Sequence, residues 1–230
     1  IDETVKIIQT FFKINLNLNY KIILNKHLGP GNARNQGIKK SSGDWIAFLD
    51  SDDIWDEKKL EICSLKINEN INYNFIPSSI IHMDKIGKIV DPSIFIKSNN
   101  LFHSLYRQNS LSTSAVIIKK RLLMETDLFN CNLLSAQDYD LWLKIALLEN
   151  CNIGFIKQPL TTYRTSNSNI SSNIKRRLDC MLQIGFKYKK NLAQKTKFSF
   201  YEFLIFKSNA YLRASIGYYK KKNFLLSDRK

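Results

Sequence analysis

The feature that most constrains the fold is a short apolar run followed directly by acidic residues. Residues 45–49 (Trp-Ile-Ala-Phe-Leu) are all apolar, and residues 50–53 read Asp-Ser-Asp-Asp. An uninterrupted apolar run of this length is typical of a strand buried on both faces of a sheet. In open α/β sheets, ligands bind beyond the carboxyl ends of the strands. The sequence therefore predicts a buried strand that presents carboxylates at a ligand site.

The pattern around this strand predicts an α/β fold. Helical spacing of apolar residues covers 5–13, 33–40, 56–70 and 136–148, and short β-rich runs cover 20–24, 73–81, 88–90, 112–118 and 152–156. The alternation of strands and helices favours a mixed, mainly parallel sheet flanked by helices. From residue 173 onward the pattern is helical, and the Ser/Asn-rich stretch 166–172 is the most plausible boundary. We expect an α/β domain over 1–170 and a basic helical extension over 171–230.

The positive charge is concentrated in that extension. The chain has a formal charge of +15, and residues 175–230 contain fifteen Lys/Arg against three Asp/Glu. Such a segment suits an anionic membrane surface or a nucleic acid, although solvated helices in a Lys-, Asn- and Ile-rich chain give the same composition. No run approaches the roughly 20 apolar residues that span a bilayer. The first residues lack the pattern of a signal peptide, and four scattered cysteines favour a reducing compartment.

The acidic residues have two readings. Asp50 and Asp52, two positions apart, point to the same side if strand geometry persists. Hard oxygen ligands of this kind suit Mg²⁺ or Mn²⁺ held together with substrate phosphates. Alternatively, Asp52 or Asp53 caps the helix that follows. The spacing alone leaves both readings open.

Two further segments could carry chemistry. The Gly-rich stretch 29–31 opens a predicted helix that contains Arg34, and it matches neither a dinucleotide fingerprint nor a P-loop. A helix start can accept an anion and an arginine can bind phosphate, but an ordinary turn is equally consistent. Asp138 falls in the first turn of another predicted helix, as a general base or as a residue that only favours the helix. Trp55 follows the acidic residues and suits either the core or sugar stacking.

In this order the segments resemble family 2 of the glycosyltransferases, inverting enzymes of the GT-A fold that use nucleotide-sugars. The resemblance lies in Ala-Arg-Asn-Gln-Gly at 33–37, Phe-Leu-Asp-Ser-Asp-Asp at 48–53, Gln-Asp at 137–138 and Tyr-Arg at 163–164. It covers about residues 1–170. Residues 1–4 resemble the end of an acidic turn in the family, so the chain is expected to begin after the family's N-terminal strand, helix and strand. Gln137 replaces the usual Glu, and no His follows Arg164.

The resemblance implies a role for each matching residue. Asp52 would hold a divalent metal, Mn²⁺ or Mg²⁺, and Asp50 would contact the metal or the sugar nucleotide. Arg34, Asn35 and Trp55 would bind the nucleotide-sugar. Asp138 would be the catalytic base.

The resemblance also implies a function. The chain would move a sugar from a nucleotide-sugar, with a UDP-sugar as first choice, to a hydroxyl of a glycan or lipid-linked glycan. The setting would be assembly of bacterial surface polysaccharide, lipopolysaccharide or glycoprotein. The enzyme would be cytoplasmic, at the inner face of the membrane through its basic segment, and would bind no nucleic acid. Two alternatives stay open: a truncated, non-catalytic remnant of such an enzyme, and a basic nucleic-acid-binding protein.

Overall fold

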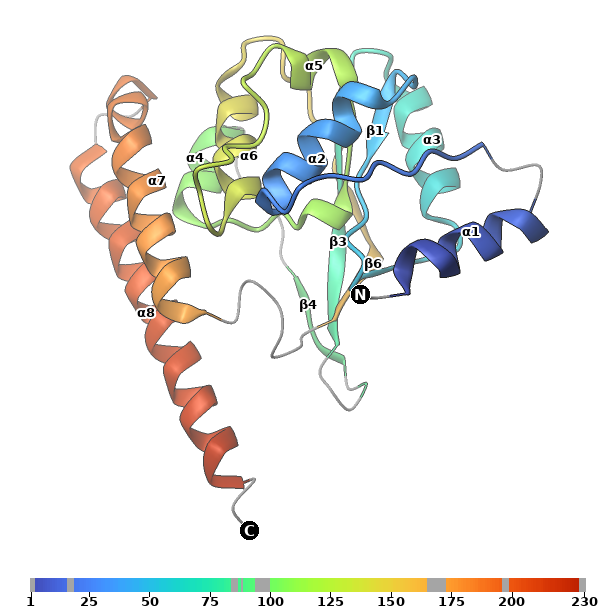
Figure 1. Cartoon of the computed structure of the whole chain (residues 1–230). Coiled ribbons are helices and arrows are strands. Elements are labelled where there is room, and N and C mark those ends of the chain that lie inside the picture. Colours follow the sequence, from blue (N-terminus) through green and yellow to red (C-terminus); the bar gives the residue numbers. More distant parts are fainter. Residues whose placement is uncertain are drawn as a thin grey trace.

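A mixed β-sheet lies at the centre of the structure, with helices packed around it (Figure 1). The computed structural model describes residues 3–15, 19–83, 87, 89–93, 100–164, 173–195 and 199–227. The strands are β1 (Trp45–Ala47), β2 (Ile54–Trp55), β3 (Phe75–Met83), β4 (Ile89–Ser93), β5 (Val116–Lys119) and β6 (Ile156–Arg164). Their order across the sheet is β1-β5-β3-β6-β2, and β4 pairs with β3.

The α/β class and the mixed sheet are confirmed, but the sheet is less parallel than expected. Among the described strands, parallel pairing between elements is confined to β3 and β6, whereas β1–β5, β3–β5, β3–β4 and β2–β6 are antiparallel. The order of strands and helices predicts parallel neighbours only if successive strands are adjacent. Here β5 inserts between β1 and β3 and runs against both.

The predicted helices are present, and two predicted strands are wrong: 20–24 is irregular, and 152–156 contributes one isolated bridge at Ile153 before β6 begins at Ile156. The helices are α1 (Thr4–Ile14), α2 (Gly29–Lys40), α3 (Lys59–Glu69), α4 (Leu101–Arg107), α5 (Lys120–Met124), α6 (Gln137–Leu147), α7 (Ile174–Lys195) and α8 (Ser199–Ser227), with a 3₁₀ turn, η1, at Thr113–Ala115. Residues 20–24 were expected to form a strand, but they have no regular structure, and Leu24 is exposed. A β-rich run becomes a strand only beside a partner, and no described strand pairs with it.

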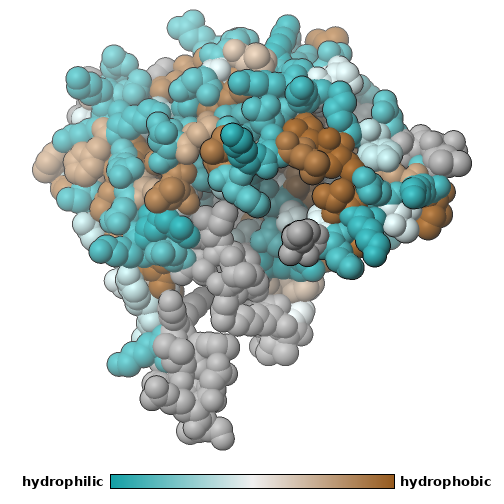
Figure 2. All heavy atoms as spheres, in the orientation of Figure 1, coloured by the Kyte–Doolittle hydropathy of each residue, from teal (hydrophilic) through white to brown (hydrophobic). Residues whose placement is uncertain are grey.

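Helix α1 stands apart from the core. It has no buried residue, and Ile7, Phe11 and Ile14 are exposed. Figure 2 shows hydrophobic spheres in the region that α1 occupies in Figure 1. The ring of Phe12 stacks on Tyr20, with 3.7 Å between ring centroids. Local contacts of this kind, rather than burial in the main core, accompany the amphipathic pattern that the sequence predicts.

The core fixes the helix that carries Asp138. Trp142 of α6 is fully buried, and its ring contacts those of Phe48, Phe75 and Phe129. Leu141 and Ile145 of the same helix are also buried, as helical spacing predicts for a core-facing stripe. Because these contacts fix α6 against the sheet, the position of its first turn is set by the core.

Helices α7 and α8 lie side by side, and the far end of α8 extends away from the rest of the molecule (Figure 1). Their inner faces join the same hydrophobic cluster as α4 and α6, through residues such as Tyr188 and Phe206. Residues 165–172, where the domain boundary was predicted, lie outside the described residues. The division at 170/171 stays a prediction. None of the helices in the described part of the chain has the length and apolar character to cross a bilayer.

Candidate active site

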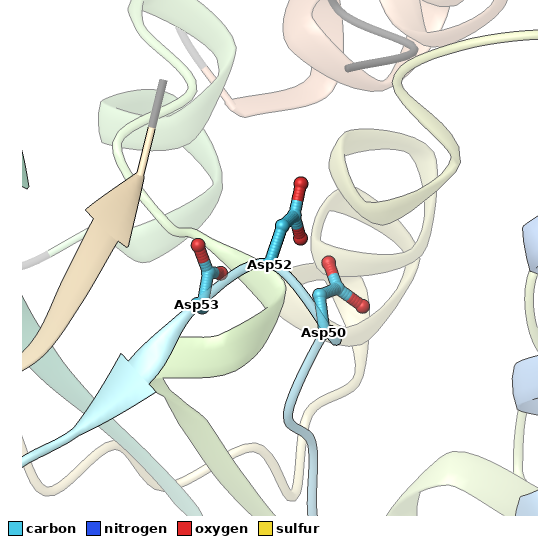
Figure 3. Close-up of side chains that lie close together, drawn as sticks. All are labelled: Asp50, Asp52 and Asp53. Atoms are coloured by element: carbon cyan, nitrogen blue, oxygen red, sulfur yellow. The ribbon is translucent and has the colours of Figure 1, made fainter. Parts of the chain in front are cut away.

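The acidic residues form a tight turn at the end of β1. Strand pairing ends after Ala47, and the backbone N–H of Asp53 donates to the carbonyl of Asp50 at 3.0 Å. One carboxylate oxygen from each of Asp50, Asp52 and Asp53 lies within 4.8 Å of the others. Figure 3 shows the three side chains on this turn, with Asp50 and Asp52 side by side. The structure therefore brings Asp50 and Asp52 together, as predicted, and adds Asp53.

The alternative role of Asp52 or Asp53 as a helix cap is wrong. Helix α3 begins at Lys59, its N-cap residue is Lys58, and no side chain caps it. Just before this helix, the carboxylate of Asp56 accepts a hydrogen bond from the backbone N–H of Lys58 at 2.9 Å. Strand β2 separates the acidic turn from the helix, so the aspartates of the turn are left for another role.

Arg34 neutralises one of these carboxylates. Its Nη2 lies 2.6 Å from Oδ1 and 2.8 Å from Oδ2 of Asp50, and its Nε lies 3.2 Å from Oδ1. The guanidinium also lies over the ring of Phe129, 5.4 Å from its centroid. Bidentate pairing of this kind is strong and fixes the geometry of both partners. Arg34 thus reaches the predicted site, where it pairs with Asp50.

Asp53 is the buried member of the cluster. Only 7% of the residue is exposed, and burial raises the pKa of its carboxyl to about 6. A hydrogen bond with Ser114 opposes this rise, and the charges of Asp52 and Asp50 add to it. Its Oδ1 is buried without a hydrogen-bond partner among the described residues. Burying a carboxylate oxygen without a donor is unfavourable.

A divalent cation fits this turn. It would supply the missing partner for Asp53 and offset the charge of Asp52. Clustered carboxylate oxygens are the ligands that Mg²⁺ and Mn²⁺ prefer. The residues present therefore suit the metal that the family resemblance implies.

The 3₁₀ turn η1 supports the acidic turn. The hydroxyl of Ser114 accepts the backbone N–H of Asp50 at 3.0 Å. The carbonyl of Ser114 accepts the indole N–H of Trp55 at 2.7 Å and the hydroxyl of Thr161 at 3.2 Å. Ser114 is fully buried. Trp55 therefore lies beside the cluster with its indole nitrogen engaged, and its contact with a sugar nucleotide stays a prediction.

A buried lysine also contacts η1. Lys59 is fully buried, and its Nζ donates to the hydroxyl of Ser78 at 3.1 Å and to the carbonyl of Ala115 at 3.4 Å. Among the described residues no carboxylate pairs with it. Burial lowers the pKa of Lys59 to about 8. The sequence gives no sign of this role, because a lysine early in a helix is usually exposed.

Asp138 lies in the first turn of α6, as predicted, and is held at both oxygens. The backbone N–H of Tyr139 donates to Oδ1 at 2.8 Å, and the hydroxyl of Thr113 contacts Oδ2 at 3.4 Å. Burial raises the pKa of Asp138, and the charge of Arg34 opposes that rise. Thr113 is the neighbour of Ser114, so η1 contacts both the acidic turn and Asp138.

Two other residues of the predicted motifs make structural contacts. The side chain of Asn35 is buried, donates to the carbonyl of Phe129 at 2.9 Å and accepts its N–H at 3.0 Å. The structure therefore does not bring the Asn35 amide to the carboxylates, and its contact with a nucleotide stays untested. Arg164 donates through Nε to the carbonyl of Asp52 at 2.6 Å. The arginine of the Tyr-Arg pair thus holds the acidic turn through its backbone.

The residues that sequence reasoning missed are Thr113, Ser114, Lys59 and Arg164 as supports of the site. Residues 112–118 were expected to form one strand. The small polar residues at the start of this run instead form η1. Their place before an apolar run is the one signal in the sequence that could have indicated the 3₁₀ turn.

The known proteins that resemble this chain in sequence are glycosyltransferases. The model of the family described as glycosyl transferase family 2 matches residues 1–133. The chain is 35% identical over 159 residues to an Escherichia coli enzyme, UDP-Glc:alpha-D-GlcNAc-diphosphoundecaprenol beta-1,3-glucosyltransferase WfgD. This match covers 66% of the chain and 58% of that enzyme. A Rickettsia bellii glycosyltransferase is 36% identical over 145 residues, covering 63% of the chain and 20% of that protein.

Solved structures share the fold. TarS from S. aureus, in complex with UDP-GlcNAc, has a TM-score of 0.59 at 21% identity over 80% of this chain and 54% of that one. The mannosyltransferase PcManGT from Pyrobaculum calidifontis, with GDP-Man and Mn²⁺, has a TM-score of 0.58 at 15% identity. That likeness covers 92% of this chain and 57% of that one. These likenesses confirm the GT-A-like fold.

Proposed function

Because the chain belongs to glycosyl transferase family 2, we propose that it transfers a sugar from a nucleotide-sugar to an acceptor hydroxyl with inversion at the anomeric carbon. The observation that carries this proposal is that one short element, η1, contacts both the acidic turn and Asp138. Ser114 holds the acidic turn, and Thr113 contacts Asp138. A donor site and a base held by adjacent residues are what a direct displacement requires.

The acidic turn is the donor end of the proposed site. Asp52 would hold the metal, with Asp53 and Asp50 beside it. A bound Mn²⁺ or Mg²⁺ would neutralise the negative charge that develops on the leaving diphosphate. Arg34, already paired with Asp50, would present its remaining N–H groups to the nucleotide. Trp55 and Asn35 complete the proposed nucleotide-sugar residues.

Asp138 is the acceptor end. Its carboxylate would take the proton from the acceptor hydroxyl while that oxygen forms a bond to the anomeric carbon. The bond from the anomeric carbon to the diphosphate breaks, and the nucleoside diphosphate leaves. One displacement from the opposite face inverts the configuration. The burial that raises the pKa of Asp138 makes it a stronger base than an exposed aspartate.

The relatives suggest the substrates. WfgD is named for UDP-Glc and for an acceptor sugar linked to diphosphoundecaprenol, and TarS is seen with UDP-GlcNAc. We therefore favour a UDP-sugar as donor and a lipid-linked glycan as acceptor in bacterial surface polysaccharide assembly. In this proposal residues 1–170 form the catalytic domain. The basic extension over 171–230 holds the enzyme at the inner face of the cytoplasmic membrane.

A donor panel tests the proposal. The full chain is incubated with Mn²⁺ and UDP-Glc, UDP-GlcNAc or GDP-Man, with a synthetic GlcNAc-diphosphate lipid as acceptor, and nucleoside diphosphate release is followed. We expect release with a UDP-sugar that EDTA abolishes, and an anomeric proton spectrum of the product that shows inversion. Retention of configuration would contradict the direct displacement. Release that EDTA leaves unchanged would contradict the metal site.

A further inference from the structure

The hairpin of α7 and α8 places two arginines together. A side chain at Gly185 would collide with Phe206, and one at Gly217 would contact Ile174 at 3.3 Å. These two contacts fix the antiparallel register of the helices. In this register Arg177 of α7 lies opposite position 214, next to Arg213 of α8. Two guanidinium groups therefore lie together on one part of the hairpin.

This pair lies within electrostatic reach of the start of α6. The pKa of Arg213 is lowered by burial and by the nearby charge of Arg177. Arg213 also acts on the phenol of Tyr139, the residue after Asp138. Arg177 is among the charges that act on Asp138 itself. The two positive charges thus lie on the side of the proposed base, on elements separate from the acidic turn.

The charges of this pair are not compensated. In the described part of the chain no carboxylate forms an ion pair with Arg177 or Arg213. By contrast, Glu202 of α8 forms an ion pair with Arg107 of α4. Arg177 is exposed and Arg213 only partly so, and two guanidinium charges brought close together repel each other unless an anion joins them.

We propose that Arg177 and Arg213 bind a phosphate group of the acceptor and so bring its hydroxyl to Asp138. This inference rests on the proposed function. The donor diphosphate already has a place at the carboxylates of the acidic turn, through a cation. A second cationic site beside the base therefore suits an anion on the acceptor side. Paired guanidinium groups match the oxygens of a phosphate or diphosphate.

The test uses inorganic pyrophosphate in EDTA, where the acidic turn has no cation and repels anions. Calorimetric titration compares the full-length wild-type chain with the Arg177→Gln, Arg213→Gln double variant. A matched control carries Lys190→Gln and Arg121→Gln, two exposed positions elsewhere that remove the same net charge. We expect the arginine variant to bind pyrophosphate at least tenfold more weakly than wild type, and the control to bind within twofold. Equal affinity in both variants overturns the proposal.

Two further readouts identify the source of the anion. If Mn²⁺-dependent UDP affinity also falls tenfold in the arginine variant, the pair belongs to the donor, and the proposal is overturned. Binding to vesicles of phosphatidylglycerol should fall equally in the two variants. A loss confined to the arginine variant, with pyrophosphate affinity unchanged, assigns the pair to the membrane and overturns the proposal.

The same measurements separate this inference from the proposed function. UDP binding with Mn²⁺ in wild type tests the donor site independently of the arginines. The single variant Arg177→Gln, at an exposed position, keeps the test valid if the change at Arg213 lowers the melting temperature. It should weaken pyrophosphate binding at least threefold, and unchanged affinity in this folded variant contradicts the proposal.

Discussion

The acidic turn at 50–53 and the cluster around Asp140 both bury a carboxylate, but only the second cluster compensates it. Asp140 is fully buried, and its Oδ1 lies 2.7 Å from Nζ of Lys187 and 3.1 Å from the hydroxyl of Tyr188. Nζ of Lys144 lies 3.2 Å from its Oδ2. This Oδ2 makes no hydrogen bond, but its ion pair with Lys144 offsets its charge, whereas the buried Oδ1 of Asp53 has neither a hydrogen bond nor an ion pair among the described residues.

We interpret this difference as that between a charge that stabilises the fold and one that serves the proposed site. Asp138 and Asp140 share the first turn of α6, yet Asp140 contacts α7 and joins two helices. Among the described residues, the hydrogen bonds to Asp138 come from a hydroxyl and a backbone N–H, and no ion pair holds it. A compensated charge stabilises the contact between elements. A charge with few partners is available for a ligand or a proton, at a cost to the stability of the free protein.

Removal of the proposed base should change turnover more than any other substitution considered below. Asp138→Asn keeps the size of the side chain but removes the base, so kcat should fall about 1,000-fold. Affinity for UDP with Mn²⁺ should stay within twofold, because the acidic turn is unchanged. Steady-state kinetics and calorimetry check the two parts. Glu149→Gln, an exposed carboxylate just beyond the end of α6, is the control and should turn over at the wild-type rate. Retained activity in Asp138→Asn contradicts the assignment of the base.

The next prediction concerns the uncompensated lysine. The pKa of Lys59 is about 8 in the folded protein and 10.5 in its ordinary state, so burial of the charge costs about 3 kcal/mol at pH 7. Lys59→Met should raise the free energy of unfolding by about that amount. The folded lysine loses its proton above pH 8 and the unfolded one only above 10.5. The advantage of the variant should therefore shrink between these values.

Urea denaturation of both proteins at pH 7 and pH 10 measures this difference. If Lys59→Met is less stable than wild type at pH 7, the hydrogen bonds of Lys59 to η1 outweigh the cost of its burial. The comparison between compensated and uncompensated charges would then fail at this position.

The compensated cluster should respond in the opposite way. Asp140→Asn leaves Lys187 without its carboxylate, while Lys144 keeps Asp127 at 2.6 Å. Because one lysine stays paired and the other is half-exposed, we expect a loss of about 2 kcal/mol rather than the full cost of an unpaired buried charge. Thermal unfolding measures this loss. The kcat of the folded variant should stay within threefold of wild type, and a much larger fall in kcat at unchanged stability would place Asp140 in the chemistry.

A change in η1 should have the mildest consequence, a loss of affinity for Mn²⁺. Ser114→Ala removes the acceptor of the Asp50 N–H and the hydroxyl that bonds Asp53. Affinity for Mn²⁺ should fall roughly tenfold, since one or two hydrogen bonds worth about 1 kcal/mol each are lost. Thr161→Val, which removes a hydroxyl from the carbonyl of the same residue, is the control and should bind Mn²⁺ as wild type does. Electron paramagnetic resonance of free Mn²⁺ reports both affinities.

The sequence predicts the parts of the site that are local. The apolar run 45–49 and the helical spacing of 136–148 are patterns within single elements, so the position of Asp50 and Asp52 at a strand end and of Asp138 at a helix start could be predicted. The direction in which neighbouring strands pair could not be predicted, because it depends on β5 lying between β1 and β3.

The contacts that join the parts could not be predicted in this way. The hydrogen bond from Asp50 to Ser114 links residues 64 positions apart, and Lys59 reaches Ala115 across 56 positions. No periodicity within one element indicates such pairs. The strand expected at 20–24 failed for the same reason, since a strand exists only with a partner that the local pattern does not specify.

We propose that the acidic turn is a metal-dependent nucleotide site. The most direct test is the melting temperature of the full chain with UDP, with and without Mn²⁺, in wild type and Asp52→Asn. Ligand at 100 times its dissociation constant stabilises a protein by about 2.7 kcal/mol, or about 5–10 °C for a chain of this size. We expect such a shift for wild type with UDP and Mn²⁺ together, and none for Asp52→Asn. An equal shift in both proteins, or one that does not need Mn²⁺, would contradict this proposal.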